Sequence, residues 1–117
     1  MNDPRKTGDG WIGVDFDSTL AHHTEDLGDD HVGAPIEPMV RKVRKWIREG
    51  RDVRLFTARK PHPVLRKWMK EHLGKILPIT NVKDRKMQAL YDDRAVGVVR
   101  NKGELFHPDN ETQVWEK

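Results

Sequence analysis

The stretch Trp11-Ile12-Gly13-Val14-Asp15-Phe16-Asp17-Ser18-Thr19 joins a short apolar run to two carboxylates that follow it directly. An apolar run of this length without polar alternation is typical of a buried strand in a sheet. Asp15 and Asp17 are two residues apart, so in extended backbone they project to the same side. Like charges held that close repel each other unless a cation or a shared proton intervenes. The stretch therefore predicts a buried strand that ends in a charged site.

Helical and strand-like segments alternate along the rest of the chain. Apolar residues recur at helical spacing over residues 39–47, and Gly50 is placed to end that helix. A second helix is expected from Pro61 to Gly74. Besides the strand at 11–14, strands are expected at 53–56, 76–80, 89–91 and 96–99, the last followed by a turn and a hairpin partner at 105–106. This order predicts an α/β fold with a Rossmann-like, doubly wound, mainly parallel sheet.

The remaining segments are expected to be irregular. Residues 1–10 are polar and are expected to form a disordered lead, with residues 11–117 as a single domain. A loop is expected from Ala21 to Pro38, and a short helical or irregular crossover from Lys83 to Gln88. The tail from His107 is polar apart from Trp115, which is expected to dock on the domain.

Composition narrows the class of protein. Hydrophobic and charged residues each make up 35% of the 117 residues, which predicts one modest core under a densely charged surface. The net charge of +3 suits an anionic substrate but does not by itself indicate nucleic acid. The chain has no cysteine, which excludes disulfides and cysteine-based metal sites. No apolar run approaches the roughly 18 residues that span a membrane, and we expect a cytoplasmic protein without a membrane partner.

Polar residues follow three of the predicted strands at their carboxyl ends. They are Asp15, Thr57 and the pair Asp92-Asp93. Parallel sheets bind ligands beyond the carboxyl ends of their strands, so we expect these side chains to converge. Several carboxylates together suit Mg²⁺, which takes a few carboxylates plus waters and phosphate oxygens. A carboxylate nucleophile can attack phosphorus once a metal, a lysine such as Lys83 and a hydroxyl mask the phosphate charge.

These motifs resemble those of the haloacid dehalogenase (HAD) superfamily. Asp15-Phe16-Asp17-Ser18-Thr19 resembles the first motif, Asp-x-Asp-x-Thr/Val, and Leu55-Phe56-Thr57 the second. Lys83 resembles the lysine of the third motif, and Tyr91-Asp92-Asp93 the acidic fourth motif. All four occur in the order of the superfamily, between Trp11 and Asp93.

The resemblance implies a phosphatase with an aspartyl-phosphate intermediate. Asp15 would be the nucleophile, and Asp17 would protonate the leaving group and later activate water. An acid at the second position is typical of the phosphatases of the superfamily and is lacking in its dehalogenases. Thr57 and Lys83 would hold the phosphoryl oxygens. The Mg²⁺ ligands would be Asp15, the backbone carbonyl of Asp17, Asp92 and Asp93, the last through water or by orienting its neighbours.

Two features of the site stay open in the sequence. Lys83 lies just after the third predicted strand and is preferred as the phosphate-binding lysine, but Lys86 also precedes the fourth strand. Arg59 either contacts substrate phosphate or lies on the surface. The three histidines of the loop, His22, His23 and His31, do not have the spacing of a zinc site.

The gaps between the motifs are too short for a cap domain. Residues 20–38 form one gap, and residues 58–82 are used by one helix and one strand. The resemblance therefore implies a capless phosphatase with an open site, and such sites go with macromolecular substrates or with a neighbouring subunit as lid. The substrate is expected to be a small phosphometabolite, a nucleotide or a nucleic-acid 3′-phosphate, and the protein a monomer or homo-oligomer.

Two other classes of function compete with the enzyme. A receiver module of the response-regulator kind would carry its phosphorylated aspartate after the third strand, where this chain has Thr80-Asn81. A non-catalytic phosphate- or nucleic-acid-binding module would use the basic face of the first helix, from Arg41 to Arg48. That face is more typical of a solvated surface.

Overall fold

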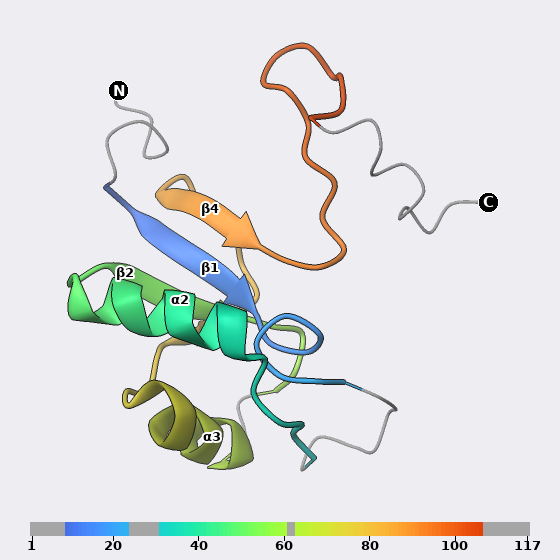
Figure 1. Cartoon of the computed structure of the whole chain (residues 1–117). Helices are drawn as coiled ribbons and strands as arrows, with labels where there is room; N and C mark the ends of the chain where they lie inside the picture. The colour runs from blue at the N-terminus through green and yellow to red at the C-terminus, as the bar shows by residue number, and fades with distance from the viewer. Residues whose placement is uncertain (1–8, 24–30, 61–62, 107–117) are drawn as a thin grey trace.

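The structure, a computed structural model, describes residues 9–23, 31–60 and 63–106. Within them the chain forms β1 (Trp11–Asp15), α2 (Glu37–Arg48), β2 (Asp52–Phe56), α3 (Pro63–Leu73), β3 (Ile79–Thr80) and β4 (Met87–Tyr91) (Figure 1). Most of the predicted lead, the predicted helix start at Pro61 and the tail with Trp115 lie outside the described residues.

The strands form one four-stranded sheet in the order β3-β2-β1-β4, and every neighbouring pair is parallel. This confirms the predicted α/β class and the parallel sheet. The register places Val14 beside both Leu55 and Tyr91. The carboxyl ends of β1, β2 and β4 are therefore level, which brings the residues that follow these strands to one edge of the sheet.

Both described helices pack on the same face of the sheet. Their buried side chains form one apolar cluster with Ile12 and Val14 of β1 and Val53 and Leu55 of β2. The alternation of these strand residues follows the period of two along a strand, so one face carries the whole cluster. A doubly wound arrangement, with helices on both faces, stays a prediction.

The ends of the two helices follow from local sequence. Helix α2 has Pro38 in its first turn, where the missing N–H costs no hydrogen bond, and basic residues in its last turn. Gly50 and Gly74, each with φ +76°, follow α2 and α3. Glycine adopts this left-handed conformation without the penalty that a side chain imposes, so both helices end where the sequence predicts.

The second face of the sheet is covered around Trp11, whose side chain is buried. Its ring stacks on Phe56 with the ring centres 6.4 Å apart, and the Arg54 guanidinium lies 4.6 Å from the ring centre. The indole N–H donates to an Asp84 carboxylate oxygen at 2.8 Å. Trp11 thus ties the loop between β3 and β4 to the sheet.

Two predicted strands differ in the structure. The strand expected at 76–80 is only Ile79–Thr80, which lies at the edge of the sheet, after Pro78. The prediction of a sheet strand at 96–99 is wrong. After Asp93 the described chain leaves the sheet, and Val98 forms an isolated bridge with Leu105. The predicted hairpin between residues 96–99 and 105–106 is confirmed, since Val98 and Leu105 pair antiparallel. The apolar residues of this segment thus pair with each other and not with a strand of the sheet.

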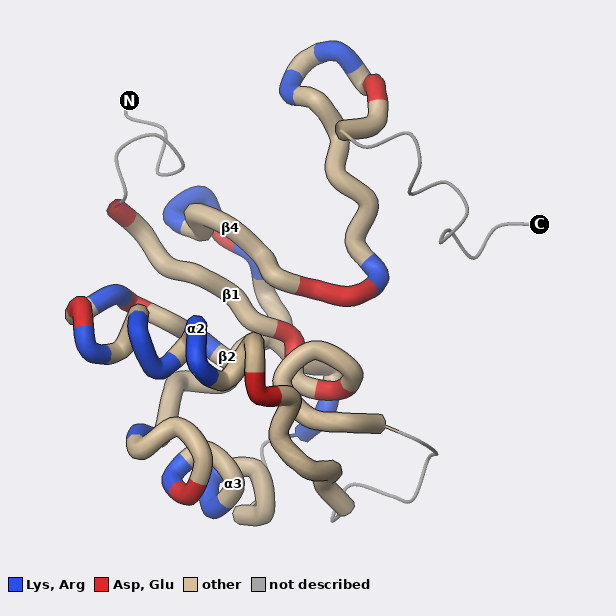
Figure 2. Tube along the Cα trace, viewed as in Figure 1, with Lys and Arg blue, Asp and Glu red and all other residues tan. Residues whose placement is uncertain are grey.

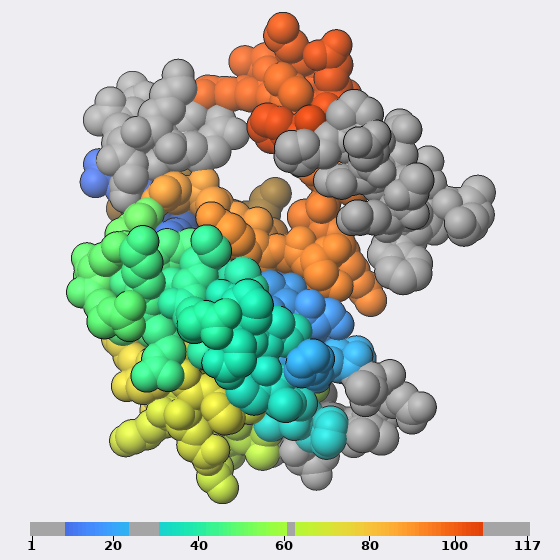
Figure 3. Space-filling view, in the orientation of Figure 1, coloured from blue at the N-terminus to red at the C-terminus, as the bar shows by residue number. Residues whose placement is uncertain are grey.

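The hairpin of residues 95–106 rises away from the sheet (Figure 1). In Figure 3 its tip, in orange-red, lies apart from the surface of the two helices, in green to yellow. None of the helices in the described part of the chain is long and apolar enough to cross a membrane. The two gaps where a cap domain would be inserted include residues 24–30 and 61–62, outside the described residues, so the absence of a cap stays a prediction.

Candidate functional site

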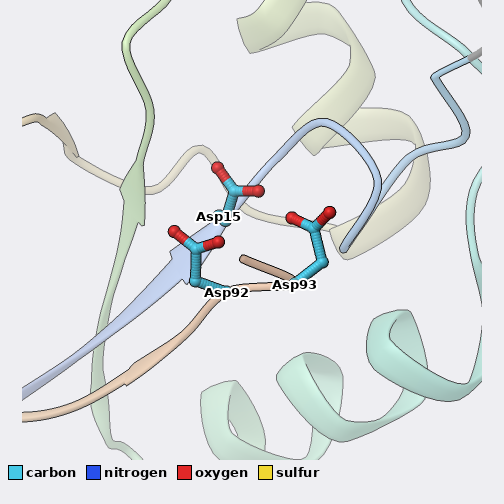
Figure 4. Close-up of side chains that lie close together, drawn as sticks. All are labelled: Asp15, Asp92 and Asp93. Atoms are coloured by element: carbon cyan, nitrogen blue, oxygen red, sulfur yellow. The ribbon is translucent and has the colours of Figure 1, made fainter. Parts of the chain in front are cut away.

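Three carboxylates meet at the carboxyl edge of the sheet. Asp15 is the last residue of β1, and Asp92 and Asp93 directly follow β4, which is the neighbour of β1. One oxygen from each can be chosen so that all three lie within 4.8 Å of one another. Figure 4 shows the three side chains turned toward the same side of the sheet edge. The structure thus brings together residues 77 and 78 positions apart, as the sequence predicts.

The surroundings of Asp15 disfavour its negative charge. Burial is the largest cause, followed by the charge of Asp92 and by contact with Asp93, and together they raise the pKa of Asp15 to about 7. Burial removes water that would solvate the carboxylate, and the neighbouring charge adds repulsion. In the absence of a cation, Asp15 therefore keeps a proton up to near-neutral pH.

A tight turn after β1 places a hydroxyl beside this cluster. The backbone N–H groups of Leu20 and Ala21 both donate to the Phe16 carbonyl, and Ser18 adopts a φ of 69°. The turn holds the buried Thr19 so that its Oγ1 lies 3.3 Å from Asp15 and 3.4 Å from Asp93. Its contact with Asp15 opposes the upward shift in pKa.

Thr57 directly follows β2, whose last residue, Phe56, lies beside Asp15 in the sheet. Its backbone N–H donates to the Thr80 carbonyl, and its side chain is buried. The Thr57 hydroxyl oxygen accepts a hydrogen bond from the Arg59 backbone N–H at 3.1 Å. A hydroxyl that accepts still has its own proton to donate, so Thr57 can donate to an oxygen of a bound anion.

Asp17 lies in the same site but outside the carboxylate cluster. Its Oδ2 accepts from Arg59 Nε at 2.8 Å and its Oδ1 from Arg59 Nη2 at 3.0 Å. His23 Nδ1 lies 3.5 Å from the same Oδ1. The guanidinium of Arg59 also lies 5.6 Å from the centre of the Phe16 ring. Arg59 is therefore a largely buried partner of Asp17 and not an exposed surface residue, and its contact with substrate phosphate stays a prediction.

These groups surround an open cavity of about 390 Å³. Six predicted site residues line it, namely Asp15, Asp17, Thr57, Arg59, Asp92 and Asp93. The other lining residues are Ser18, His23, Phe56, Ala58 and Arg94. A cavity that combines a carboxylate cluster with a hydroxyl and two guanidinium side chains can accept a metal ion and a phosphoryl group together.

Lys83 is not among the residues that line this cavity. It is exposed on the loop between β3 and β4, as is Lys86. Neither lysine lines the cavity, and the phosphate-binding role of Lys83 stays a prediction.

Two residues of the site, Thr19 and His23, were given no role of their own from the sequence. Thr19 is four residues after Asp15, and a threonine in a tight turn is a sequence signal for a hydroxyl that returns to the strand end. His23 gave no signal, because its contact with Asp17 depends on how the loop folds. Arg94 lines the cavity, and its backbone N–H donates to Asp92 Oδ1 at 2.8 Å, which fixes the carboxylate.

The comparisons with known proteins bear on the fold. No family model matches the chain, and no curated protein matches it. A solved structure of a conserved protein from Bacteroides thetaiotaomicron is similar, with a TM-score of 0.56 and 22% sequence identity. The similarity covers 80% of this chain and 83% of that protein. At this level of identity the likeness concerns the fold alone, and the chain shares its α/β architecture with that conserved protein.

Proposed function

We propose that this chain is a Mg²⁺-dependent phosphomonoester hydrolase that acts through an aspartyl-phosphate on Asp15. The observation that carries the proposal is the cavity that the cluster of Asp15, Asp92 and Asp93 lines together with Thr57 and Arg59. The resemblance of the four motifs to those of HAD phosphatases supports it. We also propose that the enzyme has no cap domain and acts in the cytoplasm.

A divalent cation suits the carboxylate cluster. Three carboxylates whose oxygens approach within 4.8 Å are the hard, anionic donors that Mg²⁺ prefers. Asp15, Asp92 and Asp93 would hold the ion, and the resemblance adds the backbone carbonyl of Asp17. When bound, the ion masks negative charge on the phosphoryl group. Asp15, whose pKa is raised to about 7, would give up its proton to hold the ion.

Asp15 and Asp17 divide the chemistry of the first step. A carboxylate oxygen of Asp15 attacks phosphorus, and the bond from phosphorus to the leaving oxygen breaks. Asp17 gives its proton to that oxygen, which prevents an unstable alkoxide from forming. Thr57 donates a hydrogen bond to a phosphoryl oxygen, which stabilises the charge that spreads over the transferred group.

The second step regenerates the enzyme. Water attacks phosphorus of the Asp15 intermediate, Asp17 takes the proton of that water, and the bond between phosphorus and the Asp15 oxygen breaks. Inorganic phosphate leaves, and Asp17 again holds the proton that the next turnover needs. One carboxyl therefore serves as acid and then as base.

The substrate class remains broad because the cavity is open. A small phosphometabolite, a nucleotide or a nucleic-acid 3′-phosphate can present a phosphoryl group to Asp15. A non-catalytic phosphate- or nucleic-acid-binding module is the alternative function. It is favoured by the exposed basic residues of α2, whose positions are the blue bands along this helix in Figure 2. They are Arg41, Lys42, Arg44, Lys45 and Arg48.

Phosphate release from a panel of phosphoesters in the presence of Mg²⁺ tests the proposal. The panel should include an aryl phosphate, sugar phosphates, nucleotides and 3′-phosphorylated oligonucleotides. We expect turnover by the wild type and a loss of roughly 10³-fold or more in Asp15→Asn and in Asp17→Asn. Asp52→Asn is the matched control, because Asp52 pairs with Arg54 at the opposite end of β2. Full activity in Asp15→Asn would exclude Asp15 as the nucleophile.

A further inference from the structure

Arg59 and Asp17 form a two-point ion pair inside the candidate site. Arg59 donates through Nε and Nη2 to different oxygens of Asp17, at 2.8 and 3.0 Å. The side chains are only 12% and 26% exposed, so water screens the pair less than a surface pair. Parallel hydrogen bonds of this kind fix the orientation of both groups.

Two further contacts hold the Arg59 end of this pair. Its backbone N–H donates to the Thr57 hydroxyl oxygen at 3.1 Å, and its guanidinium lies against the Phe16 ring. Arg59 is thereby anchored to β2 through Thr57 and to the turn after β1 through Phe16. The guanidinium stays within the cavity that also contains Asp15 and the acidic pair.

This geometry conflicts with the acid–base role of Asp17. Both carboxylate oxygens are engaged by Arg59, and His23 lies 3.5 Å from one of them. A carboxyl group held at both oxygens cannot turn toward a leaving group unless it gives up at least one bond. The group that can compete for Arg59 is an incoming phosphate, because the guanidinium fork matches phosphate as well as carboxylate oxygens.

We propose that Arg59 is a positioning residue that holds Asp17 aside in the free protein and exchanges it for the phosphoryl group of the substrate. Phosphate binding draws the guanidinium from the ionised Asp17 carboxylate. The freed carboxylate then takes up a proton from solvent and turns toward the leaving oxygen, and it gives a proton back to solvent when it pairs with Arg59 again. This inference rests on the proposed function for its catalytic meaning. The exchange itself is a binding event and can be measured without turnover.

A double-mutant cycle with inorganic phosphate tests the exchange. Phosphate affinity is measured by calorimetry at one fixed Mg²⁺ concentration for wild type, Asp17→Asn, Arg59→Gln and the double variant. Removing the Asp17 charge relieves general repulsion in both backgrounds, so that effect cancels in the cycle. Asp17→Asn also frees the Arg59 guanidinium to bind phosphate, and this second effect on affinity exists only in the proteins that carry Arg59.

We expect Asp17→Asn to tighten phosphate binding at least about threefold more with Arg59 than with Gln at position 59. Equal effects of Asp17→Asn in the two backgrounds would overturn the exchange. The pair Asp52–Arg54, also joined by two hydrogen bonds but outside the cavity, supplies the matched cycle and should give no coupling to phosphate. Because phosphate affinity is measured directly, the exchange can fail while the phosphatase is active, or hold while it is not.

A second measurement keeps Arg59 in place, in case Arg59→Gln does not fold. The side-chain Nε–H signal of Arg59 is followed by NMR during a titration with inorganic phosphate. We expect it to move toward saturation in the wild type, and to start from a different position in Asp17→Asn. A signal that stays unchanged while phosphate saturates the protein shows that Arg59 keeps Asp17, and the proposal is then wrong.

Discussion

The Thr19 hydroxyl lies 3.3 Å from an oxygen of Asp15, and the same hydroxyl lies 3.4 Å from Asp93. A hydroxyl has one proton, so it can donate to only one of these carboxylates at a time. The turn after β1 thus supplies too few donors for the acidic cluster. The remaining repulsion needs a proton or a cation, which links the stability of the fold to pH and to metal.

Metal-free protein should lose stability as the pH rises toward neutral. The pKa of Asp15 is about 7 in the folded protein and near 3.8 in an unfolded chain. Between these values the folded state binds more protons than the unfolded state, so the free energy of unfolding falls as pH increases. In EDTA, we expect Asp15→Asn to raise the melting temperature by a few degrees at about pH 8 and to have little effect near pH 4.

Other groups titrate in the same range, so the difference between variant and wild type is the quantity to compare. Asp52→Asn serves as the control, because Asp52 pairs with Arg54 and its replacement should not stabilise the protein at high pH. Adding Mg²⁺ should reduce the advantage of Asp15→Asn. A melting-temperature difference that is the same at both pH values would contradict the raised pKa of Asp15.

Mg²⁺ affinity should depend on pH through the same carboxyl group. Below the pKa of about 7 a proton occupies Asp15 and competes with the ion. We expect calorimetry to show tighter binding at about pH 8 than at pH 6, with release of a proton near pH 6. Asp92→Asn should weaken binding and also lower the pKa of Asp15, which reduces the pH dependence. If Mg²⁺ affinity does not change with pH, the ion binds at a site that does not include Asp15.

The parallel sheet could be predicted because its signals are local. The buried run at 11–14 and the apolar stripe over 39–47 each match the period of their element. The hydrophobic pattern wrongly predicted a sheet strand at Val96–Val99, since an apolar run does not specify which strand it pairs with. Val98 pairs with Leu105 in a projecting hairpin and stays half exposed, whereas a strand of the sheet would bury it.

The site was predictable where strand ends alone position a side chain. Asp15, Thr57 and Asp92 converge because the register makes their strands level. The contacts of Asp17 were not predictable, because they depend on the conformation of the turn around Ser18 and on the path of the chain to Arg59. The sequence spacing predicted that Asp17 lies near Asp15, but only the structure shows that Asp17 pairs with the Arg59 guanidinium.

The two candidate lysines should separate in substrate binding. Lys83 lies three residues after the end of β3, whereas Lys86 has its backbone carbonyl hydrogen-bonded to the Trp11 N–H at the opposite end of β1. We therefore expect Lys83→Ala to raise the KM of a phosphoester about tenfold or more, the value of a charged hydrogen bond to phosphate. Lys86→Ala, an equal change of charge, should leave KM nearly unchanged. The reverse ranking in steady-state kinetics would move the phosphate-binding role to Lys86.

The basic face of α2 should give the protein a weak, salt-sensitive affinity for oligonucleotides. Replacing Arg41, Lys45 and Arg48 with Gln should weaken binding and reduce the slope of log affinity against log salt by roughly two to three. Fluorescence anisotropy with a single-stranded oligonucleotide measures both. The matched control replaces Arg66, Lys67 and Lys70 of α3, which are equally exposed and carry the same charge. If both triple variants lose affinity equally, net charge explains the binding and α2 forms no specific surface.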